Sequence, residues 1–322
     1  MNMFEGLDPE LESPLRDFLN ALGGGFNLND IPAVRAMMDP MLAIAQAETP
    51  MVEGVCSEDL QASGGTGGHD VAIRIYRPVH LSGDLPALLW IHGGGYVLGG
   101  IEADDLMAKS LVASVHCMLV SVEYRLAPEH PFPIPLEDCY TALKWLSSTG
   151  EAHGVDTSRI AIGGVSAGGG LTAALALLAR DRGEVPIAFQ LLGCPMIDDR
   201  NIVQASEDVH DTLVWSRENN LIGWRSYLGQ EPGGEHVSPY AAPFRTSDLT
   251  GLPPTYLTTG ELDLFMAENV AYAKRLLQAG NPTELHVYPG VFHGFEGIAP
   301  TAAVSQRYLV ERDNALKRAF SG

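Results

Sequence analysis

A serine with glycines two positions to either side is the feature of this sequence most typical of covalent chemistry. Gly164, Ser166 and Gly168 follow a short apolar run and precede a stretch rich in Ala and Leu. A serine on a sharp turn between a strand and a helix projects its hydroxyl group outward, and flanking glycines avoid collisions in so tight a bend. The start of the helix also favours the negative charge that develops in acyl transfer. Ser166 is therefore the predicted nucleophile.

Other interpretations of these glycines fit less well. Gly168, Gly170 and Ala173 match a dinucleotide-binding pattern, but they fall inside the predicted helix and not in the turn before it. The chain lacks the lysine that follows a phosphate-binding loop. A plain Gly/Ser turn remains the alternative to a nucleophile.

A second glycine cluster directly follows another apolar run. His92 is followed by Gly93, Gly94 and Gly95, and consecutive glycines let backbone N–H groups face a substrate oxygen. Runs of this type supply the oxyanion hole of lipases and esterases, together with the N–H of the residue after the nucleophile. We expect Gly94, Gly95 and Ala167 to be the donors, and a flexible glycine loop is the alternative. His92 precedes the serine, so we expect it to orient the loop.

The general base should follow Ser166, because a triad of this kind runs serine, acid, histidine along the chain. His210 and His236 fall in an insertion, and His286 alternates with apolar residues inside a predicted strand. His293 follows that strand in a loop containing glycines, which can bring it to the serine. Its imidazole has an ordinary pKa of about 6.5, which suits base catalysis near neutral pH. His293 is the predicted base.

Asp263 is the predicted acid, because it comes just after the predicted strand 255–259 and before a helix. The same position would also suit a helix N-cap, which is the structural alternative. Glu261 is the nearest rival. Glu268 lies in the helical pattern and is a weaker candidate, and Asp248 precedes the strand.

Strands and helices that could hold these residues alternate from about Val71 onward. Such alternation is typical of βαβ units that build a mostly parallel sheet. The predicted strands are residues 71–76, 87–91, 117–122, 159–163, 187–192, 255–259 and 284–288. The predicted helices are residues 104–115, 136–147, 167–180, 264–279 and about 301–320.

Two segments depart from this alternation and predict a helical cap. The expected division is an N-terminal cap segment 1–48, a first core part 49–197, a cap insertion 198–234 and a second core part 235–322. Met and Trp stripes in the cap segments would also suit ordinary core packing, but an insertion at the sheet's carboxyl edge favours a cover over a pocket. Tyr96, Trp215 and Phe292 are the predicted substrate contacts.

Composition excludes several kinds of partner. The 322 residues include 20 Lys and Arg against 40 Asp and Glu, a formal net charge of −20, which disfavours nucleic acid and anionic membranes. No apolar run is long enough for a membrane span, and the acidic start does not resemble a secretory signal, so we expect a cytoplasmic protein. The four cysteines, Cys56, Cys117, Cys139 and Cys194, are widely spaced, so no metal site or disulfide framework is predicted, and three of them suit a core.

Taken together, the motifs resemble those of the bacterial hormone-sensitive-lipase-like esterases, a family of carboxylesterases. The resemblance spans roughly residues 70 to 320. It is carried, in order, by residues 92–95, 124–129 (YRLAPE), 164–169, 260–268 and 293–295. It implies an α/β-hydrolase fold with a mostly parallel central sheet, flanking helices and a cap. It also implies no cofactor, small esters with short or medium acyl chains as substrates, and a possible homodimer.

One residue departs from the family pattern, and two other functions remain open. Val165 stands before the nucleophile, where an acidic residue or threonine is common, and this leaves the local hydrogen bonding and the substrate preference open. An amidase or deacetylase would use the same triad. Related plant hormone receptors have lost a working triad, but the presence of His293 disfavours a non-catalytic receptor.

Overall fold

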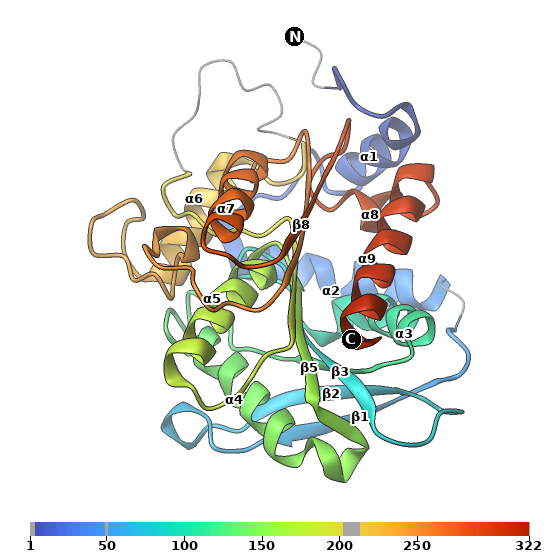
Figure 1. Ribbon diagram of the computed structural model, residues 1–322. Coiled ribbons are helices and arrows are strands. Elements are labelled where there is room, and N and C mark those ends of the chain that lie inside the picture. The colour runs from blue at the N-terminus through green and yellow to red at the C-terminus, as the bar shows by residue number, and fades with distance from the viewer. Residues whose placement is uncertain (1–3, 49–50, 202–212, 322) are drawn as a thin grey trace.

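Runs rich in Val, Ile and Leu form one eight-stranded sheet at the centre of the part of the chain that the structure describes (Figure 1). The computed structural model describes residues 4–48, 51–201 and 213–321. The strands are β1 Val55–Ala62, β2 Val71–Pro78, β3 Leu85–Ile91, β4 Met118–Val122, β5 Val155–Val165, β6 Phe189–Gly193, β7 Thr255–Gly260 and β8 Thr283–Tyr288.

The strand order is β1-β2-β4-β3-β5-β6-β7-β8. β2 pairs antiparallel with β1 and β4, and the other neighbouring pairs are parallel. Every residue of β4, β6 and β7 is buried, as expected for parallel strands covered on both faces. The chain order reverses beside β3, between β4 and β5, and ligands of open α/β sheets bind at such a point. This arrangement confirms the predicted α/β-hydrolase fold class.

Helices cover both faces of the sheet (Figure 1). On one face, α3 (Ile101–Val115) and α9 (Ala303–Ser321) share an apolar cluster with the sheet. On the other face lie α4 (Ile134–Thr149), α5 (Ala167–Arg182) and α7 (Met266–Gln278). Nearly the whole of α5 is buried, which its Gly, Ala and Leu content permits. The nucleophile turn therefore begins a helix that is enclosed on all sides.

The N-terminal segment and the insertion after β6 are joined by hydrogen bonds. The segment forms α1 (Pro9–Ala21) and α2 (Ile31–Glu48), and the insertion contains α6 (Arg217–Leu228). Asn219 in α6 accepts a hydrogen bond from the Leu28 N–H (3.3 Å) and donates one to the Phe26 carbonyl (3.0 Å). The two segments are thus in contact although 191 residues separate Asn219 from Leu28.

The sequence-based boundaries differ from the structure mainly at the sheet edge. β1 was not predicted, because most of its residues are exposed or half-buried and it has no apolar run. β5 begins four residues earlier than predicted, since its polar start still pairs with β3 through Val155 and Leu85. Cys117, Cys139 and Cys194 are buried, as predicted for core residues.

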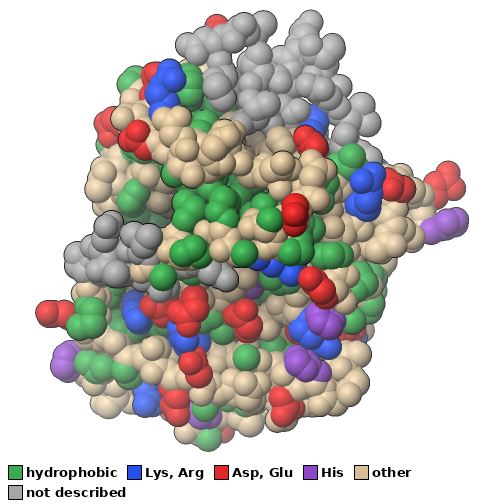
Figure 2. Space-filling view, turned by 180° about the vertical axis from the view of Figure 1, so that it is seen from behind, with side chains coloured by type: hydrophobic (Ala, Val, Ile, Leu, Met, Phe, Trp, Pro, Cys, Tyr) green, Lys and Arg blue, Asp and Glu red, His purple; other side chains and the backbone are tan. Residues whose placement is uncertain are grey.

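Basic and acidic side chains are mixed on the surface. On the face shown in Figure 2, basic side chains stand singly or in small groups beside acidic ones. Over the described residues, no helix combines the length and the apolar character that crossing a bilayer requires.

Candidate active site

Ser166 lies on a sharp turn between β5 and α5. Its backbone has φ 58° and ψ −123°, an unusual conformation for a residue with a side chain. Backbone hydrogen bonds hold it there: the Ser166 N–H donates to the Gly193 carbonyl (2.8 Å), and the Ser166 carbonyl accepts from the N–H groups of Gly170 (2.9 Å) and Met196 (3.0 Å). The surrounding chain therefore imposes the turn on the serine.

The glycines around Ser166 allow the turn to press against the end of β3. A Cβ at Gly168 would lie 2.1 Å from the Ile91 carbonyl oxygen and 2.4 Å from that of His92. A Cβ at Gly164 would lie 2.5 Å from the Gly168 carbonyl oxygen. All three distances are too short for a side chain, so only glycine permits this close approach. The nucleophile turn and the loop that begins at His92 are thus in direct backbone contact.

The structure brings Ser166, His293 and Asp263 together at the carboxyl edge of the sheet. The Nε2 atom of His293 lies 2.9 Å from Oγ of Ser166, and its Nδ1 atom lies 2.8 Å from Oδ2 of Asp263. The three residues follow β5, β8 and β7 respectively, so parallel strands of one sheet place them. The order nucleophile, base, orienting acid is the geometry that acyl transfer by a serine requires.

The environment of His293 acts on its protonation in two opposite ways. Burial disfavours the charged imidazolium, whereas the charge and the hydrogen bond of the neighbouring Asp263 carboxylate favour it, and the net result is a pKa of His293 raised well above its usual range. A raised pKa makes the imidazole a stronger proton acceptor. It also places the loss of the neutral, base-competent form at a higher pH than for an isolated histidine.

Asp263 is not the N-cap of α7, which is Phe265, but it does stabilise the turn before that helix. Its Oδ1 accepts the Phe265 N–H (2.9 Å) in the turn before α7, while Oδ2 faces His293. The rival Glu261 accepts the Gly290 N–H (3.0 Å) and so holds the loop that leads to His293. Asp263 is thus the carboxylate in contact with His293, the predicted base.

The remaining candidates lie elsewhere. Glu268 is buried in α7 and accepts the Ile197 N–H (2.9 Å), and burial raises its pKa to about 8. Asp248 caps a turn through the Thr250 N–H (2.9 Å).

The other histidines considered as the base do not take part in the Ser166–His293–Asp263 contacts. The ring nitrogens of His286 lie 2.9 Å from Glu284 and 3.3 Å from Glu311, on the outer strand β8. His236 is exposed, and His210 lies outside the described residues.

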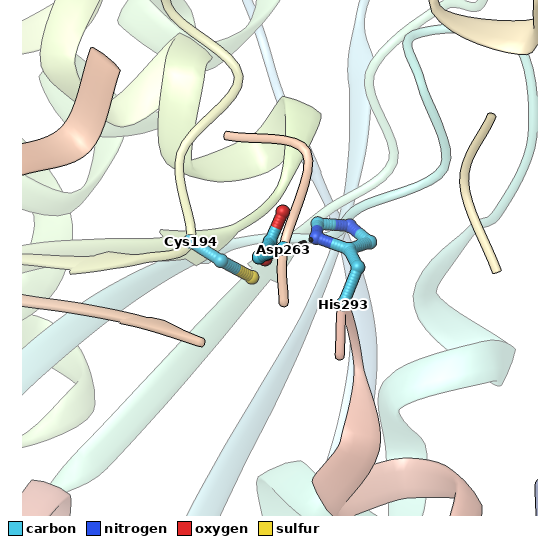
Figure 3. Close-up of side chains that lie close together, drawn as sticks. All are labelled: Cys194, Asp263 and His293. Atoms are coloured by element: carbon cyan, nitrogen blue, oxygen red, sulfur yellow. Dashed lines mark hydrogen bonds and ion pairs between the residues drawn. The ribbon is translucent and has the colours of Figure 1, made fainter. Parts of the chain in front are cut away.

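Cys194 adjoins the acid–base pair, which the sequence analysis did not foresee. Figure 3 shows its side chain beside Asp263, and one ligand atom each from Cys194, Asp263 and His293 lie within 4.8 Å of one another. Burial raises the pKa of the Cys194 thiol, so this group is a neutral thiol. Cys194 directly follows β6, and the rule that placed Asp263 at a strand end would also have singled out this position.

The predicted oxyanion loop follows β3 and faces the nucleophile. A Cβ at Gly93 would lie 3.4 Å from Cβ of Ser166, so loop and serine are in contact. Gly94 and Gly95 have φ of 112° and 60°, values that favour glycine. Among the described residues, no protein acceptor takes a hydrogen bond from the N–H of Gly94, Gly95 or Ala167. These three N–H groups are the ones that the sequence nominated as donors.

His92 supports this loop from within the core. Its Nδ1 lies 2.8 Å from the Gly93 carbonyl oxygen, and its ring stacks on Tyr124 with centroids 4.2 Å apart. The Tyr124 hydroxyl donates to the His92 carbonyl (3.1 Å). Burial lowers the pKa of His92 to about 4, so the ring is neutral at pH 7. Tyr124 belongs to the YRLAPE segment, which thereby acquires a supporting role beside the site.

The three predicted substrate contacts have different surroundings. The Tyr96 side chain is fully buried, and its hydroxyl donates to the Met196 carbonyl (2.8 Å). Phe292 is also buried, in the apolar cluster beneath α1 and the short helix α8 (Phe295–Ile298). Trp215 lies against Gly95, since a Cβ at Gly95 would lie 2.1 Å from the indole. Tyr96 and Phe292 therefore pack within the protein, and Trp215 adjoins the oxyanion loop.

Two cavities border Asp263. The larger, about 540 Å³, is lined by charged side chains such as Arg200 and Glu268 and also by apolar ones such as Phe244 and Leu264. The smaller, about 10 Å³, is lined by residues that include Cys194 and Phe295, and has room for roughly one water molecule. The lining of the larger cavity is therefore mixed in polarity.

Comparisons with known proteins identify the family of the chain. A family model described as the alpha/beta hydrolase fold matches residues 88–297. The carboxylesterase NlhH of Mycobacterium tuberculosis is 35% identical over 255 residues, which are 78% of this chain and 79% of that protein. An arylesterase of Saccharolobus solfataricus is 31% identical over 300 residues, 92% of this chain and 94% of the relative.

Solved structures extend the similarity to nearly the whole chain. A bacterial heroin esterase superposes with a TM-score of 0.90 at 44% sequence identity and covers 98% of this chain and 99% of its own. A hyperthermophilic esterase from Pyrobaculum calidifontis gives a TM-score of 0.85 at 33% identity, covering 97% and 98%. The chain therefore belongs to the α/β-hydrolase family and, within it, to the hormone-sensitive-lipase-like carboxylic ester hydrolases whose ordered motifs its sequence contains.

Proposed function

We propose that this enzyme hydrolyses small carboxylic esters through an acyl-enzyme intermediate formed on Ser166. The observation that carries the proposal is the continuous contact from Asp263 through His293 to Ser166, at 2.8 Å and 2.9 Å. In the first step Oγ of Ser166 attacks the ester carbonyl carbon while Nε2 of His293 takes the hydroxyl proton. The resulting imidazolium then gives this proton to the departing alkoxide, and the alcohol leaves.

Water completes the reaction with the same groups. The water oxygen attacks the acyl carbon while His293 takes a proton from the water. His293 then returns the proton to Oγ of Ser166 as the carboxylic acid leaves. Asp263 keeps the proton of the neutral imidazole on Nδ1 and stabilises the imidazolium in both halves. The N–H groups of Gly94, Gly95 and Ala167 bind the oxyanion of each tetrahedral intermediate.

Esters with short or medium acyl chains are the proposed substrates. The relatives described above are named for ester hydrolysis, and the bacterial heroin esterase among them is 44% identical. This supports esters over amides, although the same groups can act on both. The N-terminal segment 1–48 and the insertion 198–234 form the proposed cap, with Trp215 as the substrate contact next to Gly95.

The decisive experiment compares Ser166→Ala with the wild type on paired esters and anilides of the same acyl group. Ester hydrolysis should be abolished except for residual activity, about 10³- to 10⁴-fold above water, from the oxyanion donors and binding. A phosphonate should label the wild-type protein at Ser166, as read by mass spectrometry, and should not label the variant. Ser148→Ala, at an exposed serine in α4, is the control. Near wild-type turnover by Ser166→Ala would refute the nucleophile, and faster anilide hydrolysis would refute the ester assignment.

A further inference from the structure

The oxyanion loop, residues 93–98, is in direct contact with the insertion that follows β6. Gly223 in α6 faces the Gly95 carbonyl: a Cβ at residue 223 would lie 2.9 Å from that oxygen. From Trp215, Cη2 and Cζ2 would lie 2.1 Å and 2.4 Å from a Cβ at Gly95. The two glycines have no side chain, and this lets helix, indole and loop approach one another closely.

Trp215 is itself held in place. Its indole Nε1 donates to Oδ1 of Asn220 (3.4 Å), and Nδ2 of Asn220 donates to the Asn201 carbonyl (2.6 Å). The Trp215 residue is 6% exposed. Its ring is thus fixed to α6 and to the chain leaving β6, so it meets Gly95 as a rigid surface.

The loop is also held on its other side. Tyr96 follows Gly95 and stacks on Tyr227 of α6, with ring centroids 4.0 Å apart. The Tyr96 hydroxyl approaches α5 so closely that a Cβ at Gly170 would lie 2.5 Å from it. The loop therefore packs between helix α6 of the insertion and helix α5, which follows Ser166.

The N-terminal segment adds a third support. Arg35 in α2 donates through Nε to the Val97 carbonyl (2.8 Å) and through Nη2 to the Ala127 carbonyl (2.8 Å). Its Nη1 donates to Glu129 (2.8 Å). One guanidinium thus ties the loop to the YRLAPE segment, and both proposed cap segments contact the oxyanion loop.

We infer that Gly223 and Trp215 are positioning residues for the oxyanion hole, so that the insertion acts on the chemical step as well as on substrate entry. The inference rests on the proposed function, because it takes Gly94 and Gly95 as oxyanion donors. Such donors act only when they lie about 2.7–3.1 Å from the oxyanion. A displaced Gly95 carbonyl moves the peptides beside it, and a misplacement of about 1 Å can cost 10²-fold in rate.

The test is Gly223→Ala, with Gly234→Ala as the matched control. Both changes add one methyl group to the predicted insertion, but a Cβ at residue 234 meets no atom within 4 Å. Gly223→Ala should lower kcat about 10-fold with little change in KM, because both acylation and deacylation use the oxyanion donors. Gly234→Ala should behave like the wild type.

A transition-state analogue separates positioning from pocket shape. A trifluoromethyl ketone forms a tetrahedral oxyanion on Ser166, whereas the product alcohol carries no such charge. Gly223→Ala should weaken ketone binding by the same factor as kcat/KM and leave the alcohol unchanged. An unchanged kcat overturns the inference, and so does an equal loss for ketone and alcohol, which would mean that Gly223 shapes the pocket only.

A second variant keeps the test decisive if Gly223→Ala folds poorly. Trp215→Phe removes the outer ring atoms that contact Gly95, and we expect a smaller fall in kcat with the same ketone-specific loss. If Trp215→Phe kept the wild-type kcat and the wild-type affinity for the ketone, the inference would also be overturned. Active Ser166→Ala would instead refute the proposed function, so the two failures are distinguishable.

Discussion

Asp263 and His293 are 30 residues apart in the sequence, yet Oδ2 of Asp263 lies 2.8 Å from Nδ1 of His293. β7 and β8 are adjacent parallel strands, and each residue follows the carboxyl end of its strand. The same Asp263 carboxylate accepts the Phe265 N–H, which fixes its orientation toward the imidazole. The acid–base pair is therefore held by the sheet and by the first turn before α7.

Asp263→Asn should lower kcat/KM by about 10⁴-fold, because the amide no longer holds the His293 tautomer in which Nε2 accepts the serine proton. Glu261→Gln is the matched control. Its carboxylate accepts the Gly290 N–H, and a glutamine oxygen preserves that bond. Steady-state kinetics on one ester compare the variants. A larger loss for Glu261→Gln would show that the acid is misassigned.

The pH dependence of kcat/KM follows from the protonation of His293. Only the neutral imidazole accepts the serine proton, so activity should fall as pH decreases through the pKa of His293. Since Asp263 raises this pKa, removing the charge in Asp263→Asn should move the acid limb to lower pH. Initial rates across pH, in buffers of constant ionic strength, measure the shift. An acid limb that stays at the same pH in the variant would contradict the pairing.

The value of kcat/KM should depend on the length of the acyl chain, because a longer chain buries more apolar surface. Each added methylene contributes about 0.8 kcal/mol when buried, so kcat/KM should rise up to about fourfold per methylene until the pocket is filled. Beyond that length it should fall sharply. A series of p-nitrophenyl esters with increasing acyl length measures the profile. A flat profile would mean that the acyl chain stays in solvent.

Asp138→Ala should destabilise the fold beside the site. The buried Asp138 carboxylate pairs with Arg125 of the YRLAPE segment, with Nη2 and Oδ1 2.6 Å apart. Removing one partner of a buried pair costs about 3–5 kcal/mol, and we expect the lower end because Arg125 can reach solvent. Urea unfolding measures the change.

The control for that prediction is an ion pair of the same kind on the surface. Glu231 pairs with Arg225 at 2.7 Å, and both side chains are exposed. Glu231→Ala should leave the urea midpoint nearly unchanged, because water screens exposed pairs. Equal losses in the two variants would show that burial of Asp138 is not the cause.

The residues proposed as nucleophile, acid and base follow strand ends, and this is why the sequence could indicate their positions. Ser166 stands in a glycine pattern that only a strand-to-helix turn explains, and His293 follows the last predicted strand. The fold class followed from the same alternation of apolar runs. The sequence thus predicted where these three residues lie in the fold.

Contacts between residues far apart in the chain leave no comparable pattern in the sequence. Gly223 touches Gly95 across 128 positions of chain (223 − 95), and a glycine has no side chain whose type could indicate a partner. β1 was missed because an exposed edge strand needs no apolar run. Tyr96 and Phe292 were expected at the substrate, but their large apolar rings are equally suited to the core, where the structure places them.

The thiol of Cys194 offers a vibrational probe of the acid–base pair. An S–H group beside Asp263 and His293 lies in the electric field of their charges, so its infrared stretching frequency should report when the imidazole gains or loses a proton. The other buried thiols belong to other elements, Cys117 just before β4 and Cys139 in α4, and subtracting the Cys194→Ala spectrum isolates the band. The protonation of the base can then be followed in the resting enzyme, without substrate and without an added label.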